Sequence, residues 1–375
     1  MTKKTAVILI GFMPNPRIYK RIALENELYD LHLICWDRGK NMLSFSSGEE
    51  PCEVHCIRLP AGDDPVRRAI PYAKFNARAM KLLKELSPDV VHVQGLDMLK
   101  LACRYKRQSR KKVSLLYEVA DLHRLLVDKQ KNPVRRLAQA YLRFEDKRCS
   151  KKIDKLIVTS DQYYDAYFSA FVPEEKKLVI PNMPDLGAFK DFVRPPHVSP
   201  LTVGYIGGVR YKEQMRHLVT AAEKSGLPLL IAGFEAEPIE IQPLCERYEK
   251  GEWVGKFDFM TQAAGLYAKC DIMYSVYNAD MANVRVALPN KLYEAVYCET
   301  PLIVAKGTYL EKVVTEWGVG VGVDHHDPDA LAALLTRMNQ DHAYYEGFVE
   351  HCRLRKAEIG MEKYNRQLKE FLLSL

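Results

Sequence analysis

The stretch Leu288-Pro-Asn-Lys-Leu-Tyr-Glu-Ala-Val-Tyr-Cys-Glu-Thr-Pro-Leu-Ile-Val-Ala305 joins a helix to a buried strand. Pro289 fits at or just before the first helical turn, and Asn290 can cap exposed amides there. Pro301 ends the helix ahead of the apolar run 302–305. The stretch therefore predicts the helix-to-strand unit of an α/β protein.

The start of this helix suits an anion. Backbone amides and the positive end of the helix dipole favour phosphate, and Lys291 adds a full charge. Glu294 carries a carboxylate that only accepts hydrogen bonds, so it can hold paired hydroxyls of a ribose or sugar. An amphipathic helix with an ordinary surface Lys and Glu explains the same residues, and both interpretations stay open at this point.

Short apolar runs alternate with helical stretches along the whole chain. The predicted strands cover 6–10, 30–35, 90–93, 113–117, 156–158 and 178–180, and then 202–206, 229–232, 271–274, 302–305 and 320–323. Strands that alternate with helices predict parallel sheets covered on both faces, which is the doubly wound α/β arrangement.

The length of 375 residues suggests two domains, each large enough for its own core. Residues 181–200 contain five prolines and show no clear periodicity, as expected of a linker. We therefore predict a first domain over 1–190 and a second over 191–356. The C-terminal segment 357–375 contains a last helix that we expect to complete the first domain.

A second phosphate motif opens the second domain. A predicted strand runs into Gly207 and Gly208, where the backbone can approach a ligand closely, and Arg210 and Lys212 follow. The guanidinium of Arg210 can contact a diphosphate with two parallel hydrogen bonds. A plain strand-turn-helix junction is the alternative. The segment is not a Walker loop, and the absence of GxGxxG here disfavours NAD binding.

These motifs resemble those of glycosyltransferase family 4, whose donor site has a Pro-x-Lys-Leu-x-Glu-Ala helix followed by a Pro-headed strand. The segment around Arg210 is similar to the family's Gly-Gly-x-Arg loop at the donor pyrophosphate. Trp253-Val-Gly-Lys256 resembles the family segment beside the nucleobase, although the Trp253 ring itself is expected in the core. The donor-binding residues that this resemblance and the helix start imply are Gly207, Gly208, Arg210, Lys212, Gly255, Asn290, Lys291, Leu292 and Glu294.

The resemblance implies the GT-B fold, in which two doubly wound domains face each other across a cleft. The first domain would hold the acceptor, and the second would hold a UDP- or GDP-linked sugar. The family's usual first glutamate falls at Val286, so that part of the pattern is missing. Family members with the lysine-containing variant also lack this glutamate, and we interpret Val286 as a mark of that subfamily.

Several polar residues of the first domain are candidates for the acceptor side. Arg17 follows two stiffening prolines and could meet a phosphate, while Gln94 stands where the family often has a second histidine. His92 is expected in the core. Glu118, Asp121 and His123 end another predicted strand, and we assign Asp121 and His123 to acceptor hydroxyls. The acceptor-side candidates are thus Arg17, Gln94, Asp97, Glu118, Asp121 and His123.

The resemblance implies transfer of a sugar to an acceptor hydroxyl with retention of configuration, and it requires no covalent nucleophile. Arg210 and Lys291 would stabilise the departing diphosphate, so cations take the place of a metal and no cofactor is expected. Asp327 is expected to cap a helix rather than bind a metal. Cys52, His55 and Cys56 lack a partner pair at zinc-finger spacing, so we assign no metal site.

The charged residues are distributed unevenly along the chain. Residues 1–190 hold 35 Lys plus Arg against 23 Asp plus Glu, and segment 104–155 alone holds 17 against 6. Without a recognisable nucleic-acid module, this basic bias favours an anionic membrane surface over nucleic acid. The helix predicted after Asn132 has an apolar stripe and basic flanks, and we expect the stripe to be buried in its own domain.

Nine cysteines without CxxC spacing and the lack of a secretory signal indicate a cytoplasmic protein, held in part at the inner face of the plasma membrane. The preferred acceptor is a glycan or lipid-linked intermediate of surface polysaccharide biosynthesis. Two alternatives stay open: a non-hydrolysing nucleotide-sugar epimerase, and a non-catalytic GT-B partner subunit, which the missing glutamate would suit.

Overall fold

The computed structural model describes residues 3–39, 52–62, 64–121, 124–128, 130–235 and 240–375. The chain forms two compact units, one from Met1–Pro181 together with Glu362–Leu375 and the other from Asn182–Met361. The predicted boundary after residue 190 lies further along the chain than this division, and the last helix belongs to the first unit.

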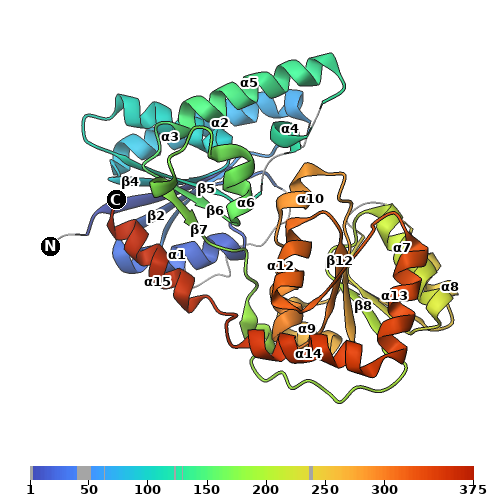
Figure 1. Ribbon diagram of the computed structural model, residues 1–375. Coiled ribbons are helices and arrows are strands. Elements are labelled where there is room, and N and C mark those ends of the chain that lie inside the picture. Colours follow the sequence, from blue (N-terminus) through green and yellow to red (C-terminus); the bar gives the residue numbers. More distant parts are fainter. Residues whose placement is uncertain (1–2, 40–51, 63, 122–123, 129, 236–239) are drawn as a thin grey trace. The chain divides into compact units, whose positions relative to one another are not determined.

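The first unit is built on a parallel sheet with the order β3-β2-β1-β4-β5-β6-β7 in its described part. Helices α2, α3 and α5 lie on one side of this sheet, and α1 and α15 lie on the other (Figure 1). The strands are β1 (Thr5–Ile10), β2 (Asp30–Asp37), β3 (Glu53–Arg58), β4 (Val90–Gln94), β5 (Ser114–Val119), β6 (Lys155–Val158) and β7 (Lys177–Val179). The helices are α1 (Pro16–Leu28), α2 (Pro65–Leu86), α3 (Leu96–Gln108), α4 (Arg124–Val127), α5 (Pro133–Ser150), α6 (Asp161–Tyr163) and α15 (Glu362–Leu373), with the shorter turns η1 (Tyr164–Phe168) and η2 (Glu174–Lys176).

The second unit has a parallel sheet with the order β10-β9-β8-β11-β12-β13 in its described part. Helices α7 and α13 pack together on one side, and α9 and α12 lie on the other (Figure 1). The strands are β8 (Val203–Ile206), β9 (Leu229–Ala232), β10 (Gly251–Gly255), β11 (Ile272–Ser275), β12 (Leu302–Ala305) and β13 (Gly320–Val323). The helices are α7 (Lys212–Ser225), α8 (Gln242–Arg247), α9 (Phe259–Ala268), α10 (Ala282–Val286), α11 (Asn290–Tyr297), α12 (Tyr309–Trp317), α13 (Pro328–Gln340) and α14 (His342–Lys356), with the short turn η3 (Leu186–Phe189).

The predicted doubly wound α/β fold is confirmed, because both described sheets are parallel and carry helices on both faces. Two strands escaped prediction, β3 and β10, and each lies at an edge of its sheet. The central strands β1, β8 and β12 are buried almost throughout, as expected of strands covered on both faces.

The proline-rich segment 181–200 is packed rather than loose. Phe189 is buried, with its ring centroid 5.4 Å from that of Tyr267. Arg194 donates to the carbonyl of Cys270 at 2.7 Å and pairs with Asp271 at 2.9 Å. Most of the predicted linker therefore belongs to the second unit.

Helix α15 packs on the first unit. The hydroxyl of Tyr29 donates to the carbonyl of Leu372 at 2.7 Å, and the Ser114 hydroxyl donates to the carbonyl of Leu375 at 3.2 Å. Lys369 pairs with Glu27 of α1 at 2.5 Å. These bonds join the end of the chain to α1, to Tyr29 between α1 and β2, and to β5.

Helix α5 exposes the apolar stripe that was expected to be buried. Its predicted apolar stripe is largely uncovered, because Val134, Leu137 and Tyr141 are 76%, 75% and 56% exposed, and the neighbouring Phe144 is 63% exposed as well. The buried residues of α5 come only from its last turns, at 145, 146, 149 and 150. The expected burial of this stripe was wrong, because helical periodicity shows that a face is apolar but not what covers it.

None of the described helices combines the length and the apolar character that crossing a bilayer would require.

Candidate functional site

Helix α11 places a buried cation at the carboxyl end of the second sheet. Lys291 is only 7% exposed, although it lies in the first turn after Pro289. Its Nζ donates to the hydroxyl of Tyr277 at 3.4 Å and lies 3.9 Å from the ring centroid of Tyr205. An ammonium over an aromatic face is attracted by the ring electrons, and this attraction grows when water is excluded.

The environment keeps Lys291 charged. Burial opposes the charge, but Tyr205, Tyr277 and Glu294 outweigh it and raise the pKa of Lys291 above its ordinary value. A buried, fully charged ammonium is costly unless an anion accompanies it. The site is therefore ready to receive a negative group.

The Gly207-Gly208 turn lies against the same ammonium. Gly207 follows β8 with φ +130°, and a Cβ at this position would lie 3.1 Å from Lys291 Nζ. A Cβ on Gly208 would lie 3.8 Å from Nε of Arg210. The side chains of Lys291 and Arg210 thus border two consecutive glycines.

The backbone around this turn is tightly packed. Gly207 N–H donates to the carbonyl of Ala232 at 2.8 Å, and Gly233 N–H donates to the carbonyl of Gly255 at 2.7 Å. A Cβ on Gly233 would lie 1.8 Å from the Gly207 carbonyl oxygen, so only glycine fits there. Gly255, a predicted donor-site residue, thereby lies next to the Gly207-Gly208 turn through Gly233.

Glu294 and Asn290 lie on the same helix. Glu294 is 6% exposed and accepts a hydrogen bond from the Tyr267 hydroxyl at 2.8 Å, and burial raises the pKa of its carboxyl. Asn290 does not cap the helix as expected, because Pro289 occupies the N-cap position and makes no side-chain cap bond. The Asn290 Oδ1 atom is buried with no hydrogen-bond partner among the described residues. Such an atom indicates a missing polar group.

Two predicted donor residues occupy other environments. Leu292 is fully buried in the core, and its amide donates to the Pro289 carbonyl at 3.1 Å. Neither its side chain nor its amide is therefore available to bind a nucleotide-sugar. Lys212 begins α7 with its side chain 44% exposed and lies 4.0 Å from Glu240. Val286 ends α10.

Tyrosines are the residues that sequence reasoning missed. Tyr205 and Tyr277 contact Lys291, and the ring of Tyr211 lies 5.4 Å from that of Tyr277. Tyr211 has a left-handed backbone with φ +62° directly after Arg210. Strained non-glycine residues concentrate at functional sites, but this strain appears only in the structure, so no local sequence pattern identified these tyrosines.

In the first unit, Glu118 is a structural residue rather than an open acceptor contact. It is completely buried and pairs with Arg17 at 2.5 Å and with Arg21 at 3.1 Å. Although burial opposes its charge, Arg21, Arg17 and His92 hold the pKa of Glu118 well below its ordinary value. The acceptor role expected for Glu118 is therefore not supported, because Arg17 and Arg21 occupy both of its oxygens, whereas the acceptor-side role of Arg17 stays a prediction.

His92 extends this network and lies in the core as expected. Its Nδ1 lies 2.6 Å from Glu25, and its Nε2 forms an ion pair with Glu118 at 3.0 Å. Burial lowers the pKa of His92, but Glu25 and Glu118 outweigh it and raise that pKa to about 9. The network joins α1, β4 and β5 at the carboxyl edge of the first sheet.

The remaining acceptor candidates have separate environments. Gln94 ends β4 with its Oε1 buried and without a hydrogen-bond partner in the described part of the chain. Asp121 is exposed and accepts a hydrogen bond from Tyr163 at 3.2 Å. His123 lies outside the described residues. Asp97 is exposed at the start of α3 and lines a cavity with basic walls, formed by Lys100, Arg104, Arg107, Arg148 and Lys152 among others.

Asp327 caps α13 through the amides of Asp329 and Ala330, as expected.

Trp253 is partly buried against the core of the second unit, and its ring therefore packs largely as predicted.

Two family models match the chain. The glycosyl transferase 4-like domain covers residues 23–183, and the glycosyl transferases group 1 domain covers residues 189–355. Among curated proteins, the succinoglycan biosynthesis protein ExoL of Rhizobium meliloti is 24% identical over 316 residues, which is 80% of this chain and 75% of ExoL.

Solved structures share the whole fold. Sucrose-phosphate synthase from Thermosynechococcus elongatus superposes with a TM-score of 0.74 at 17% identity, with 99% of both chains covered. HepE of Anabaena in complex with UDP superposes with a TM-score of 0.71 at 14% identity, over 99% of this chain and 100% of HepE. HepE with UDP-glucose gives a TM-score of 0.68 at 15% identity and the same coverage. The two matched domains, which together span most of the chain, and the GT-B fold show that it belongs to the family 4-like glycosyltransferases.

Proposed function

We propose that the protein transfers a sugar from a nucleotide diphosphate to an acceptor hydroxyl with retention of configuration. One observation carries the proposal: Lys291 and Arg210 border the same Gly207-Gly208 turn, and Lys291 is a buried cation without a carboxylate in hydrogen-bonding contact among the described residues. A diphosphate supplies the matching charge.

The chemistry follows from this charge. The acceptor oxygen forms a bond to the anomeric carbon while the bond from that carbon to the diphosphate oxygen breaks on the same face. The departing oxygen takes the acceptor proton, and the two cations stabilise its developing charge. Glu294 would bind ribose hydroxyls, and the unpaired Oδ1 of Asn290 would accept a donor hydroxyl. The chain's own cations would perform the role that a metal has in other transferases.

UDP is the proposed nucleotide, because HepE was solved with UDP and UDP-glucose. The proposed product is part of a surface polysaccharide, in line with the name of ExoL. A hexose is the proposed transferred unit.

The proposed acceptor is a lipid-linked glycan at an anionic bilayer. Helix α5 exposes the apolar side chains Val134, Leu137, Tyr141 and Phe144, and Arg135, Arg136 and Lys147 are also exposed. Apolar side chains beside basic ones suit the interface of an anionic membrane. The cavity lined by Lys100, Arg104, Arg107, Arg148 and Lys152 is proposed to bind phosphates of the same surface.

One experiment tests the transfer. The purified protein is screened by thermal shift against UDP, GDP and their sugars, and the donor that binds is then incubated with lipid-linked acceptors while nucleotide release is measured. We expect release only with an acceptor, and Arg210→Ala or Lys291→Ala should lower turnover by about 100- to 1000-fold.

Other outcomes would replace the proposal. A sugar epimerised without acceptor would identify an epimerase, and nucleotide binding without turnover for any acceptor would identify a partner subunit. Wild-type turnover in both variants would contradict the assigned roles of Arg210 and Lys291.

A further inference from the structure

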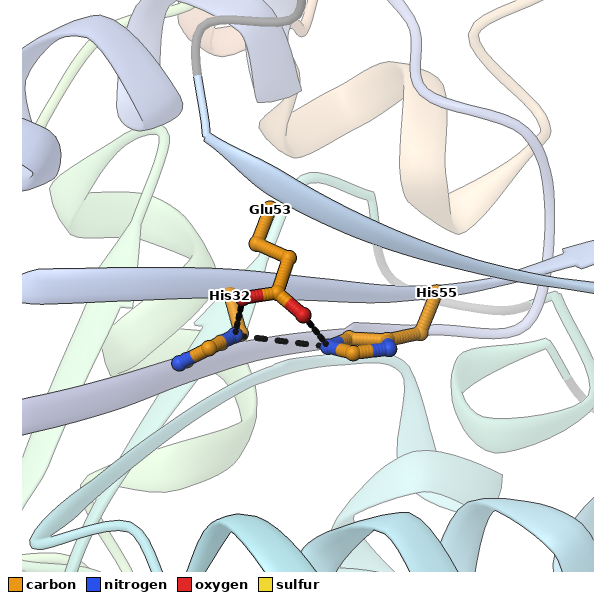
Figure 2. A group of neighbouring side chains, drawn as sticks. All are labelled: His32, Glu53 and His55. Atoms are coloured by element: carbon orange, nitrogen blue, oxygen red, sulfur yellow. Dashed lines mark hydrogen bonds and ion pairs between the residues drawn. The ribbon is translucent and has the colours of Figure 1, made fainter.

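Three metal-binding side chains converge on the edge of the first sheet. His32 lies on β2, and Glu53 and His55 lie on the neighbouring edge strand β3. The register pairs His32 with Glu53 and Ile34 with His55, so all three side chains share one face of the parallel pair. Figure 2 shows the Glu53 carboxylate reaching across to the nitrogens of the two rings.

The three side chains lie close together, and Glu53 approaches the two rings with different oxygens. His32 Nδ1 lies 3.3 Å from His55 Nε2 and 3.4 Å from Glu53 Oε2, and Glu53 Oε1 lies 3.5 Å from His55 Nε2. Zinc bound tetrahedrally at about 2.0–2.1 Å keeps its ligand atoms about 3.3–3.4 Å apart. The two ring nitrogens therefore have the spacing of two corners of a zinc site, and the Glu53 carboxylate, whose ligand oxygen lies within 4.8 Å of both, can supply the third.

A hydrogen bond between the rings explains the arrangement less well. At 3.3 Å the two ring nitrogens are further apart than a usual N–H hydrogen bond of about 2.7–3.2 Å. Such a bond also leaves the Glu53 carboxylate 3.4 Å or more from both rings. A shared cation satisfies the lone pairs of both rings and the carboxylate charge together.

The surroundings also suit a metal. The side chains of His32 and His55 are 10% and 18% exposed, which holds their rings in place, whereas Glu53 is 65% exposed and leaves one side open to water. The far nitrogen of His32, Nε2, lies 3.9 Å from Asp30. At this distance Asp30 is not hydrogen-bonded to the ring, but its negative charge favours a cation at the site.

We propose that His32, Glu53 and His55 bind one Zn²⁺ ion, with water in the fourth position, and that the ion fastens edge strand β3 to β2. The cluster lies at the amino ends of these strands, whereas Gln94 and Glu118 lie toward the carboxyl ends of β4 and β5. The zinc is structural and takes no part in sugar transfer.

The chain offers a matched control. Asp280, His325 and His326 also come close together, with His326 Nε2 3.2 Å from Asp280. That group is more open, because the side chains of His326 and Asp280 are 47% and 70% exposed and His326 Nδ1 also contacts Glu213 at 3.3 Å. His326→Gln therefore removes an imidazole from a looser cluster of the same chemistry.

The first test measures zinc binding to the full chain after removal of metal with a chelator. A coloured zinc chelator competes with the wild-type protein and with Glu53→Gln, His55→Gln and His326→Gln. We expect one tight site per wild-type chain, retained in His326→Gln. Removing an outer-shell partner typically weakens metal binding by about 10- to 100-fold. Removing a direct ligand, as in Glu53→Gln or His55→Gln, should weaken zinc binding by more than this. Because Glu53 is exposed, Glu53→Gln should fold normally, which circular dichroism checks.

A second measurement reports geometry and stability. Co²⁺ in place of zinc should give the intense visible absorption of a tetrahedral site in the wild type and in His326→Gln only. Zn²⁺ should raise the melting temperature of these two proteins, and Mg²⁺, which prefers oxygen ligands, should not. Equal zinc binding by wild type and folded Glu53→Gln, or loss of the site in His326→Gln, would overturn the proposal.

Discussion

The ammonium of Lys291 lies 3.9 Å from the ring centroid of Tyr205, so a charged side chain is held over an aromatic face inside the protein. The ring comes from β8 and the lysine from α11, and Gly207 follows β8 directly. Strand, turn and helix therefore present one cation at the position where the Gly207-Gly208 turn approaches a ligand.

Replacing Lys291 with Met should weaken the binding of UDP by about 10- to 100-fold, because a charge-assisted hydrogen bond contributes about 1.5–3 kcal/mol. The fold should persist, since Met fills similar volume beside Tyr205. Isothermal titration calorimetry measures the affinity. Lys312→Met, at a site where the lysine is 62% exposed, should bind UDP like the wild type.

Gly207→Ala should destabilise the protein by more than about 1 kcal/mol, because φ +130° is unfavourable for alanine and the new methyl group would lie 3.1 Å from Lys291 Nζ. Gly208→Ala is the matched control, since its methyl group would meet nothing closer than 3.8 Å. Chemical unfolding of both variants without ligand measures the difference. Equal losses of stability would contradict this account of the turn.

The sequence predicted the central strands but neither β3 nor β10. Central parallel strands are covered on both faces and appear as continuous apolar runs. The sequence Glu53-Val-His-Cys-Ile-Arg58 of β3 contains no apolar run longer than two residues, and only Ile57 is buried. Strand β10 contains two glycines and has no buried residue. Both edge strands thus lack the continuous apolar run from which the other strands were predicted.

The candidate site was predictable where its chemistry is local. Lys291 and Arg210 belong to short motifs with phosphate-binding character, and the structure places both beside one turn. Glu118 was misjudged because its partner Arg17 is 101 residues away in sequence. Pairing over such a distance depends on tertiary packing, which no local pattern reports.

Glu118→Gln should destabilise the protein by about 3–5 kcal/mol, because it leaves Arg17 and Arg21 without their buried counter-charge. Glu316→Gln removes an exposed helical pair, Lys312–Glu316, and should change stability by less than about 0.5 kcal/mol. Denaturant unfolding compares the two variants. A small effect for Glu118→Gln would show that the network is not a structural unit.

Stability should fall as the pH rises above neutrality, because His92 has a pKa raised to about 9 in the folded protein. Its ordinary value of 6.5 makes the contribution complete below about pH 6.5, and it is lost as the pH passes through 9. The total should be about 3 kcal/mol, from about 1.4 kcal/mol for each pKa unit. The slope of unfolding free energy over this range should be shallower in His92→Gln, and an unchanged slope would contradict the assignment.

The double variant Leu137→Asp/Phe144→Asp should weaken binding to anionic liposomes by at least about 100-fold. Each of these exposed side chains can contribute about 1.5–3 kcal/mol when it enters the bilayer interface, and each new carboxylate is also repelled by the lipid charge. Sedimentation with vesicles of anionic and of neutral lipid measures binding. Val198→Asp, at an equally exposed apolar position of the second unit, should bind like the wild type.

Because Arg135, Arg136 and Lys147 accompany the stripe, wild-type binding should also weaken as salt rises. Binding by the double variant at the wild-type level would place the membrane contact elsewhere than α5.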